Sequence, residues 1–171
     1  MMKQRELIVI AHNLRSCHNV GSLLRTAEGL GVRTVYLSGY TPYPEMPDDD
    51  RLPHIRQKLH KQIQKTALGA ERLVDWQVYK NIADLFDLLG QQNTPVYAVE
   101  QAKGSITLPG FQPPDRLALL VGREVEGVEP EVLARCKAAL EIPMAGSKES
   151  FNVVQAAGMA LYHCAFFQET Q

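Results

Sequence analysis

Short apolar runs alternate along the chain with segments of helical spacing. The runs are rich in β-branched and aliphatic residues, as buried strands are, and lie at 7–11, 34–37, 96–99, 117–121 and 140–142. The segments between and after them predict helices, from apolar spacing or from a proline suited to a first turn, at 20–30, 54–68, 81–89, 130–136 and 151–167. This alternation is typical of an α/β fold with a mostly parallel sheet flanked by helices.

Local signals define the surroundings of the first helix. Asn19 is suited to be its N-cap, and Gly31 is suited to end it. The helix and its two neighbouring strands then form a βαβ unit, which implies parallel pairing and a right-handed crossover. Residues 39–53 hold four prolines and three consecutive aspartates, so we expect an extended acidic loop there.

The composition is that of one folded domain. The chain has 171 residues, of which 45% are hydrophobic, and this predicts a single domain over residues 1–171. The formal net charge is -1, so no global positive field attracts nucleic acid or membranes. A partner of either kind must therefore meet a local patch.

Several classes of protein are disfavoured by absent patterns. Three cysteines, Cys17, Cys136 and Cys164, are odd in number and form no CxxC pair, which argues against a disulfide framework and favours a reducing cytoplasm. We expect neither export by a signal peptide nor a membrane span, because the apolar runs are too short for either. The histidines show no metal-ligand spacing, so no metal is expected, and the chain has no GxGxxG motif and no P-loop.

Chemistry is expected where loops leave the carboxyl ends of the strands, because ligands of parallel sheets bind at that edge. Three loops there combine small residues with hydrogen-bonding side chains, at 13–25, 122–128 and 142–152. Each alone has an ordinary structural explanation, since Asn19 can cap a helix and Glu124 can be a surface charge near a helix start. Because all three loops belong to one edge, they predict a single site.

These loops carry three motifs in a fixed order. The motifs are Asn-x-Gly followed by arginine at 19–25, Gly-x-Glu-x-x-Gly at 122–127, and Ile-Pro-Met-x-Gly followed by Ser-x-Asn at 142–152. Their order and separation resemble those of the SpoU (TrmH-like) family of RNA ribose 2′-O-methyltransferases, within the SPOUT superfamily. The resemblance covers nearly the entire chain.

This resemblance implies a fold, a reaction and partners. The fold is a SPOUT-type α/β domain with a C-terminal trefoil knot, and the family forms homodimers. The reaction transfers the methyl group of S-adenosyl-L-methionine to a ribose 2′-hydroxyl of RNA. We favour tRNA slightly over rRNA, because no separate RNA-binding domain precedes the motifs. A non-catalytic RNA-binding or assembly protein that retains the fold, or a flavodoxin-like phosphate or nucleotide binder, stays open as an alternative.

The resemblance also assigns roles to residues. Those implied for catalysis are Arg25, Asn19, Glu124, Ser150 and Asn152. Those implied for binding S-adenosyl-L-methionine, mainly through backbone groups, are Val99, Gly122, Ile142, Met144, Ser150 and Phe151. Arg25 is the proposed catalytic residue of the family, but a guanidinium with a pKa above about 12 is a poor base. It can instead clamp the target phosphate, while that phosphate or Glu124 assists the loss of the proton.

A basic stretch is the candidate for RNA contact. Between Arg51 and Lys65 there are five basic residues and no acidic residue. We expect RNA to contact Arg15, Arg51, Arg56, Lys58, Lys61, Lys65 and Arg123. A solvated helix face explains the same stretch without RNA.

Overall fold

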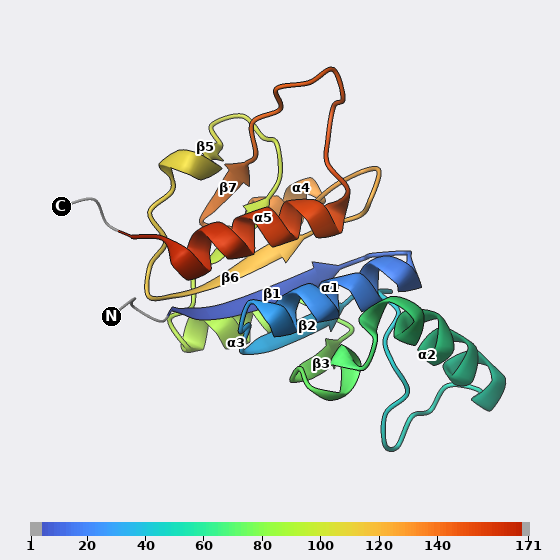
Figure 1. Ribbon diagram of the computed structural model, residues 1–171. Coiled ribbons are helices and arrows are strands. Elements are labelled where there is room, and N and C mark those ends of the chain that lie inside the picture. Colours follow the sequence, from blue (N-terminus) through green and yellow to red (C-terminus); the bar gives the residue numbers. More distant parts are fainter. Residues whose placement is uncertain (1–4, 169–171) are drawn as a thin grey trace.

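A seven-stranded parallel sheet forms the centre of the computed structural model, which describes residues 5–168 (Figure 1). Its strands are β1 (Glu6–His12), β2 (Thr34–Ser38), β3 (Trp76–Tyr79), β4 (Val96–Val99), β5 (Ile106–Thr107), β6 (Arg116–Val121) and β7 (Ala138–Glu141). They lie in the order β3-β2-β1-β6-β4-β7-β5, and all six neighbouring pairs are parallel. The predicted α/β architecture is confirmed.

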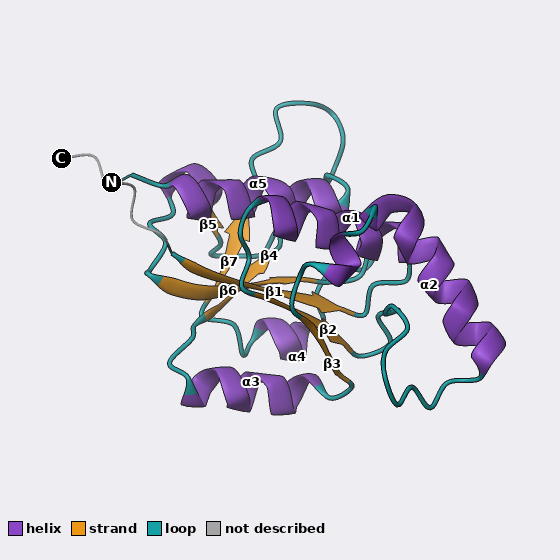
Figure 2. Ribbon diagram, turned by 60° about the horizontal axis from the view of Figure 1, so that its bottom comes forward, coloured by secondary structure: helices purple, strands orange, loops and turns teal. Residues whose placement is uncertain are grey.

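Helices cover both faces of this sheet. They are α1 (Cys17–Gly29), α2 (Pro53–Ala67), α3 (Ile82–Gln91), α4 (Pro130–Leu133) and α5 (Val153–Phe166), with single 3₁₀ turns η1 (Ala70–Arg72) and η2 (Leu108–Gly110). Figure 2 shows α1, α2 and α5 on one side and α3 and α4 on the other. Each side has its own apolar core, so the central strands β1 and β6 are buried on both faces. This double burial explains why their sequences are continuous apolar runs.

The predicted elements agree with the observed ones except at a few ends. The sequence pattern does not predict two strands: β3, which is half-exposed at the edge of the sheet, and β5, which has only two residues. The helix predicted at 130–136 ends at Leu133, and the last helix begins at Val153 instead of residue 151. The trefoil knot stays a prediction, and residues 1–4 and 169–171 of the predicted domain lie outside the described residues.

The prediction that Asn19 caps α1 is wrong. The helix begins at Cys17, three residues before the predicted start, and Ser16 is its N-cap. The Ser16 hydroxyl accepts the backbone N–H of Asn19 at 3.2 Å, because a serine one residue before a helix satisfies one of its free amides. The Asn19 side chain is therefore free to make contacts outside the helix.

The glycine of the first motif has a packing role. A Cβ atom at Gly21 would collide with the Ile63 carbonyl oxygen and lie 2.9 Å from the Ala67 nitrogen, both in α2. Only glycine lets α1 and α2 approach this closely. The approach fixes α1, and with it the first motif, against the next helix.

Candidate active site

A cavity of about 270 Å³ opens at the carboxyl ends of β4, β6 and β7. Its wall consists of strand ends, the two loops that follow β6 and β7, and the first turn of α5. The lining residues are Val99, Glu100, Gln101, Val121, Gly122, Arg123, Glu124, Val125, Gly127, Leu140, Ile142, Glu149, Ser150, Phe151, Val153 and Ala156. The second and third motifs thus border one cavity at the predicted edge of the sheet.

Glu124 connects the second motif to the first. Its Oε1 atom accepts hydrogen bonds from the backbone N–H groups of Arg15 (3.2 Å) and Ser16 (3.0 Å), and the Arg15 N–H also donates to Oε2 at 3.1 Å. The Asn19 amide donates to Oε1 as well, at 3.2 Å. Burial by itself raises the pKa of Glu124, but these hydrogen bonds outweigh it and lower the pKa below its ordinary value. Glu124 is therefore an anion fixed at the N-terminus of α1, where the helix dipole also favours it.

Asn19 connects the first motif to the third. Its side-chain oxygen accepts a hydrogen bond of 3.3 Å from the Asn152 amide. The Asn152 oxygen in turn caps α5 by accepting the Val154 N–H at 2.9 Å. The three motifs consequently meet in a chain of side chains, Glu124 to Asn19 to Asn152, beside the cavity.

Two glycines shape the loop that carries Glu124. A Cβ at Gly122 would lie 2.8 Å from the Gly127 carbonyl group, so the loop can close on itself only because no side chain stands at residue 122. Gly127 has a φ of +72°, and a Cβ there would collide with Glu100 Oε2. That Glu100 oxygen accepts the Val128 N–H at 3.0 Å and so ties the loop to the end of β4.

Five of the six residues implied for cofactor binding line the cavity, and Met144 does not. Glu100, Gln101 and Glu149 also line it, although the sequence does not predict them. Gln101 donates to the Glu149 carbonyl oxygen at 2.9 Å and joins the end of β4 to the third motif. The signal that could have found Glu100 and Gln101 is their place directly after a buried strand.

Arg25 does not lie at the cavity. It is exposed on α1, outside the lining, six residues after Asn19. At about 100° per residue the two side chains do not share a face of the helix. A single copy of the described chain therefore brings Asn19, Glu124, Ser150 and Asn152 together and leaves Arg25 apart, so its catalytic role stays a prediction.

The predicted basic residues divide into two groups. Arg51 and Arg56 both contact acidic residues of the 39–52 loop. Arg51, near the end of this loop, donates from Nε to Asp49 at 2.8 Å, and Arg56, in α2, pairs with Glu45 at 2.9 Å. Arg51 also stacks on the Tyr43 ring, with 3.6 Å from its Cζ atom to the ring centre. The acidic loop thus neutralises part of the stretch that the sequence shows as free of acids.

The second group stays open to solvent. Lys58, Lys61 and Lys65 are exposed on α2, at a spacing that places them on one face of the helix. Near the cavity, Arg15 pairs with Glu126 at 2.9 Å, and Arg123 lies 3.5 Å from Glu129. Contact of these cations with RNA stays a prediction.

Two further findings concern residues 5–168. Within that range no group of three or more His, Cys, Asp or Glu residues is arranged to hold a metal ion. None of the helices between those limits is both long and apolar enough to cross a membrane.

Comparison with known proteins places the chain in a family. The model of the SpoU rRNA Methylase family matches residues 50–162. The chain belongs to this family. One relative is the 23S rRNA (guanosine-2′-O-)-methyltransferase RlmB of Salmonella typhi. It is 30% identical to this chain over 162 residues, which cover 94% of this chain and 60% of the relative. The SpoU chain therefore spans less than two thirds of the length of this relative.

A second relative is named for tRNA. The tRNA (guanosine(18)-2′-O)-methyltransferase of Thermus thermophilus is 26% identical over 160 residues, covering 94% of the SpoU chain and 74% of the relative. Among solved structures, a TrmH-family protein from Porphyromonas gingivalis superposes with a TM-score of 0.75 at 26% identity, over 96% of this chain and 61% of that one. A structure concerned with 2-OH methylation of C/U34 on tRNA gives a TM-score of 0.73 at 25% identity and covers 94% of both chains.

Proposed function

We propose that this chain is an S-adenosyl-L-methionine-dependent methyltransferase that modifies a ribose 2′-hydroxyl of RNA. The observation that carries the proposal is the connection of Glu124, Asn19 and Asn152 beside the cavity, which unites the three motifs. Membership of the SpoU family and relatives named as 2′-O-methyltransferases support it. tRNA is the favoured substrate, since the tRNA-modification structure matches the SpoU chain over 94% of both lengths.

The cavity has the properties that the cofactor needs. Val99, Leu140 and Ile142 give it an apolar wall suited to adenine, and strand-end backbone groups beside Gly122 provide hydrogen bonds. A side chain at Gly122 would fill the space between this residue and Gly127. When bound, S-adenosyl-L-methionine supplies an activated methyl group on a sulfonium.

The residues of the chain have distinct tasks in this proposal. Val99, Gly122, Ile142, Ser150 and Phe151 hold the cofactor, whereas Met144 does not line the cavity, and its implied contribution stays a prediction. Glu124, Asn19 and Asn152 fix the three loops relative to one another, so that a ribose hydroxyl is aligned with the cofactor. Arg25 acts on the substrate phosphate or on the proton of the hydroxyl.

The proposal includes a homodimer. An open apolar hollow on α5 is lined by Gly158, Met159, Tyr162, His163, Phe166 and Phe167, and the Tyr162 side chain is 62% exposed. A second copy of the chain would cover this surface. Because Arg25 is apart from the cavity of its own chain, the second copy would bring an Arg25 to it. The free thiols and an RNA substrate agree with a cytoplasmic location.

The test of this function is methyl transfer in vitro. Purified protein is incubated with labelled S-adenosyl-L-methionine and total tRNA or rRNA, and the digested RNA is analysed for 2′-O-methylnucleosides. We expect label in one such nucleoside, more from tRNA, and loss of most of it in Arg25→Ala while the thermal transition of the variant is unchanged. Binding of the cofactor without transfer to any RNA would favour the non-catalytic alternative.

A further inference from the structure

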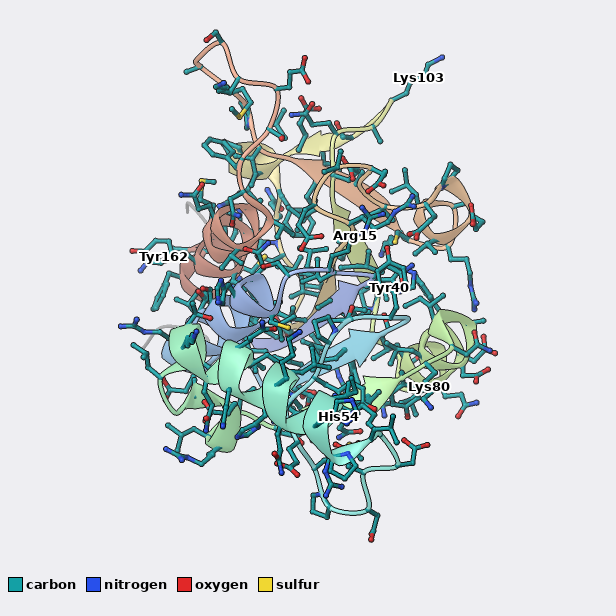
Figure 3. All side chains as sticks on the ribbon, turned by 90° about the vertical axis from the view of Figure 1, so that its right-hand side faces the viewer. Arg15, Tyr40, His54, Lys80, Lys103 and Tyr162 are labelled. Carbon is teal, nitrogen blue, oxygen red and sulfur yellow. The ribbon has the colours of Figure 1, made fainter. Side chains whose placement is uncertain are left out.

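An exposed aromatic side chain lies beside an exposed arginine near the cavity. The Tyr40 residue is 54% exposed, and the Arg15 side chain is 59% exposed. Figure 3 shows both side chains close together at the same side of the molecule. The Tyr40 side chain and, after it, Glu126 raise the pKa of Arg15 above its ordinary value, which agrees with the neighbouring positions of Tyr40 and Arg15.

The Asn13 side chain fixes the backbone that carries Tyr40. The Tyr40 N–H donates to the Asn13 side-chain oxygen at 3.1 Å, and a Cβ at the preceding Gly39 would collide with that oxygen. The Asn13 amide donates to Glu129 at 2.7 Å and lies 3.1 Å from Nε2 of His12, which is buried. The ring of Tyr40 therefore projects from a rigid support.

Two hydrogen bonds of the next residue, Thr41, also fix the backbone beside Tyr40. The buried Thr41 hydroxyl donates to the Ala11 carbonyl oxygen at 2.9 Å and accepts the Leu14 N–H at 3.0 Å. The loops at 12–16 and 38–41 are thus joined on both sides of Tyr40. A backbone held in this way loses little conformational freedom when something binds to the tyrosine ring.

The pair is adjacent to the cavity. The Arg15 backbone N–H donates to Glu124, and its guanidinium pairs with Glu126 in the loop that borders the cavity. A strand of RNA whose ribose lies at the opening of the cavity, beside the bound cofactor, would pass this pair with a neighbouring nucleotide. Unpaired bases are recognised by stacking on aromatic rings and on arginine planes.

We propose that Tyr40 and Arg15 form a stacking subsite for an unpaired nucleobase next to the nucleotide that is modified. This inference depends on the proposed function, because it assigns the substrate of the same site as a single-stranded segment of RNA. The ring of Tyr40 offers the stacking face, and Arg15 adds a planar cation that also attracts the neighbouring phosphate.

The experiment measures binding of RNA without requiring catalysis. A dye-labelled single-stranded oligoribonucleotide, and the same strand paired with its complement, are titrated with the full chain and followed by fluorescence anisotropy. The variants are Tyr40→Ala, Tyr40→Phe and Lys137→Ala. The last is a control that removes an exposed charge directly before β7, at the amino edge of the sheet opposite the cavity. Thermal unfolding checks that each variant is folded.

The expected result separates stacking from general charge attraction. Wild type binds the single strand more tightly than the duplex, and Tyr40→Ala weakens single-strand binding about tenfold. Tyr40→Phe stays within about twofold of wild type, since phenylalanine also stacks. Lys137→Ala changes both affinities little. Equal loss on single strand and duplex, or no loss in Tyr40→Ala, would overturn the subsite. If wild type transfers no methyl group, the proposed function is refuted, but the binding assay still tests the stacking subsite because it does not require catalysis.

Discussion

Replacement of Glu124 by glutamine tests whether the charge of this residue holds the three motifs together. Glutamine has the same shape, but it turns one acceptor oxygen into an N–H donor that faces the N–H groups of Arg15 and Ser16. A hydrogen bond to a charged group contributes about 1.5–3 kcal/mol, and partial exposure of Glu124 reduces this. We expect Glu124→Gln to lose about 1.5 kcal/mol of unfolding free energy at neutral pH. For a chain of this length that lowers Tm by about 3–6 °C.

The pH dependence of this loss identifies its cause. The folded pKa of Glu124 is below the ordinary value of 4.5, so its charge stabilises the fold above that pH. The stabilisation is lost as the pH falls through the folded pKa. The Tm difference between wild type and Glu124→Gln should therefore be largest at neutral pH and become smaller below about pH 4.5. Calorimetric scans over this range measure it.

A neighbouring residue provides the control. Glu126 is in the same loop and pairs with Arg15, but it is exposed, and its carboxylate does not take part in the bonds that Glu124 makes with Ser16 and Asn19. Glu126→Gln should have the Tm of wild type within error, because exposed ion pairs contribute little. A Glu124→Gln variant as stable as wild type, or a Tm deficit that stays constant through acidic pH, would refute the reasoning.

Three other substitutions probe the supports of the site. Gly127→Ala should lose about 1–3 kcal/mol of unfolding free energy in denaturant, because alanine is strained at a φ of +72° and its Cβ would meet Glu100. The control Gly90→Ala, in an open helical position, should gain about 0.5–1 kcal/mol of unfolding free energy. Ser16→Ala should lose about 1 kcal/mol in the same assay by removing the cap of α1, and an unchanged midpoint would contradict that assignment. Burial lowers the pKa of His12 below 6.5, so wild type should lose stability as the pH falls below that value, and His12→Gln should lose less over the same pH range.

The sequence predicts the sheet well because its signal is local. Continuous apolar runs mark the strands that are buried on both faces, and the loops that follow parallel strands meet at one edge. This reasoning places Glu124, Ser150 and Asn152 near one another without a structure. It does not find β3, whose residues are half-exposed at the sheet edge and show no clear alternation.

The contacts that make the site depend on tertiary structure. Either Ser16 or Asn19 could cap a helix by composition, and only the position of Glu124 shows that Asn19 is used elsewhere. In the same way, the basic stretch from Arg51 to Lys65 is free of acids in sequence, but the preceding loop brings Glu45 against Arg56 of α2. Periodicity describes neighbours along one element, and these pairs come from different elements.

The bonding of Glu124 also bears on how the ribose proton is handled in the proposed reaction. A general base needs a free lone pair directed at the proton and a pKa near the working pH. Both Glu124 oxygens already face N–H donors from the first motif, and its pKa is lowered, so it is a weak and occupied acceptor. Protonating it would weaken the bonds that hold Asn19 in place. The geometry therefore favours Glu124 as a positioning residue. In the function that we propose, this leaves the phosphate of the bound RNA, aligned by Arg25 of a second copy, as the group that assists the loss of the proton.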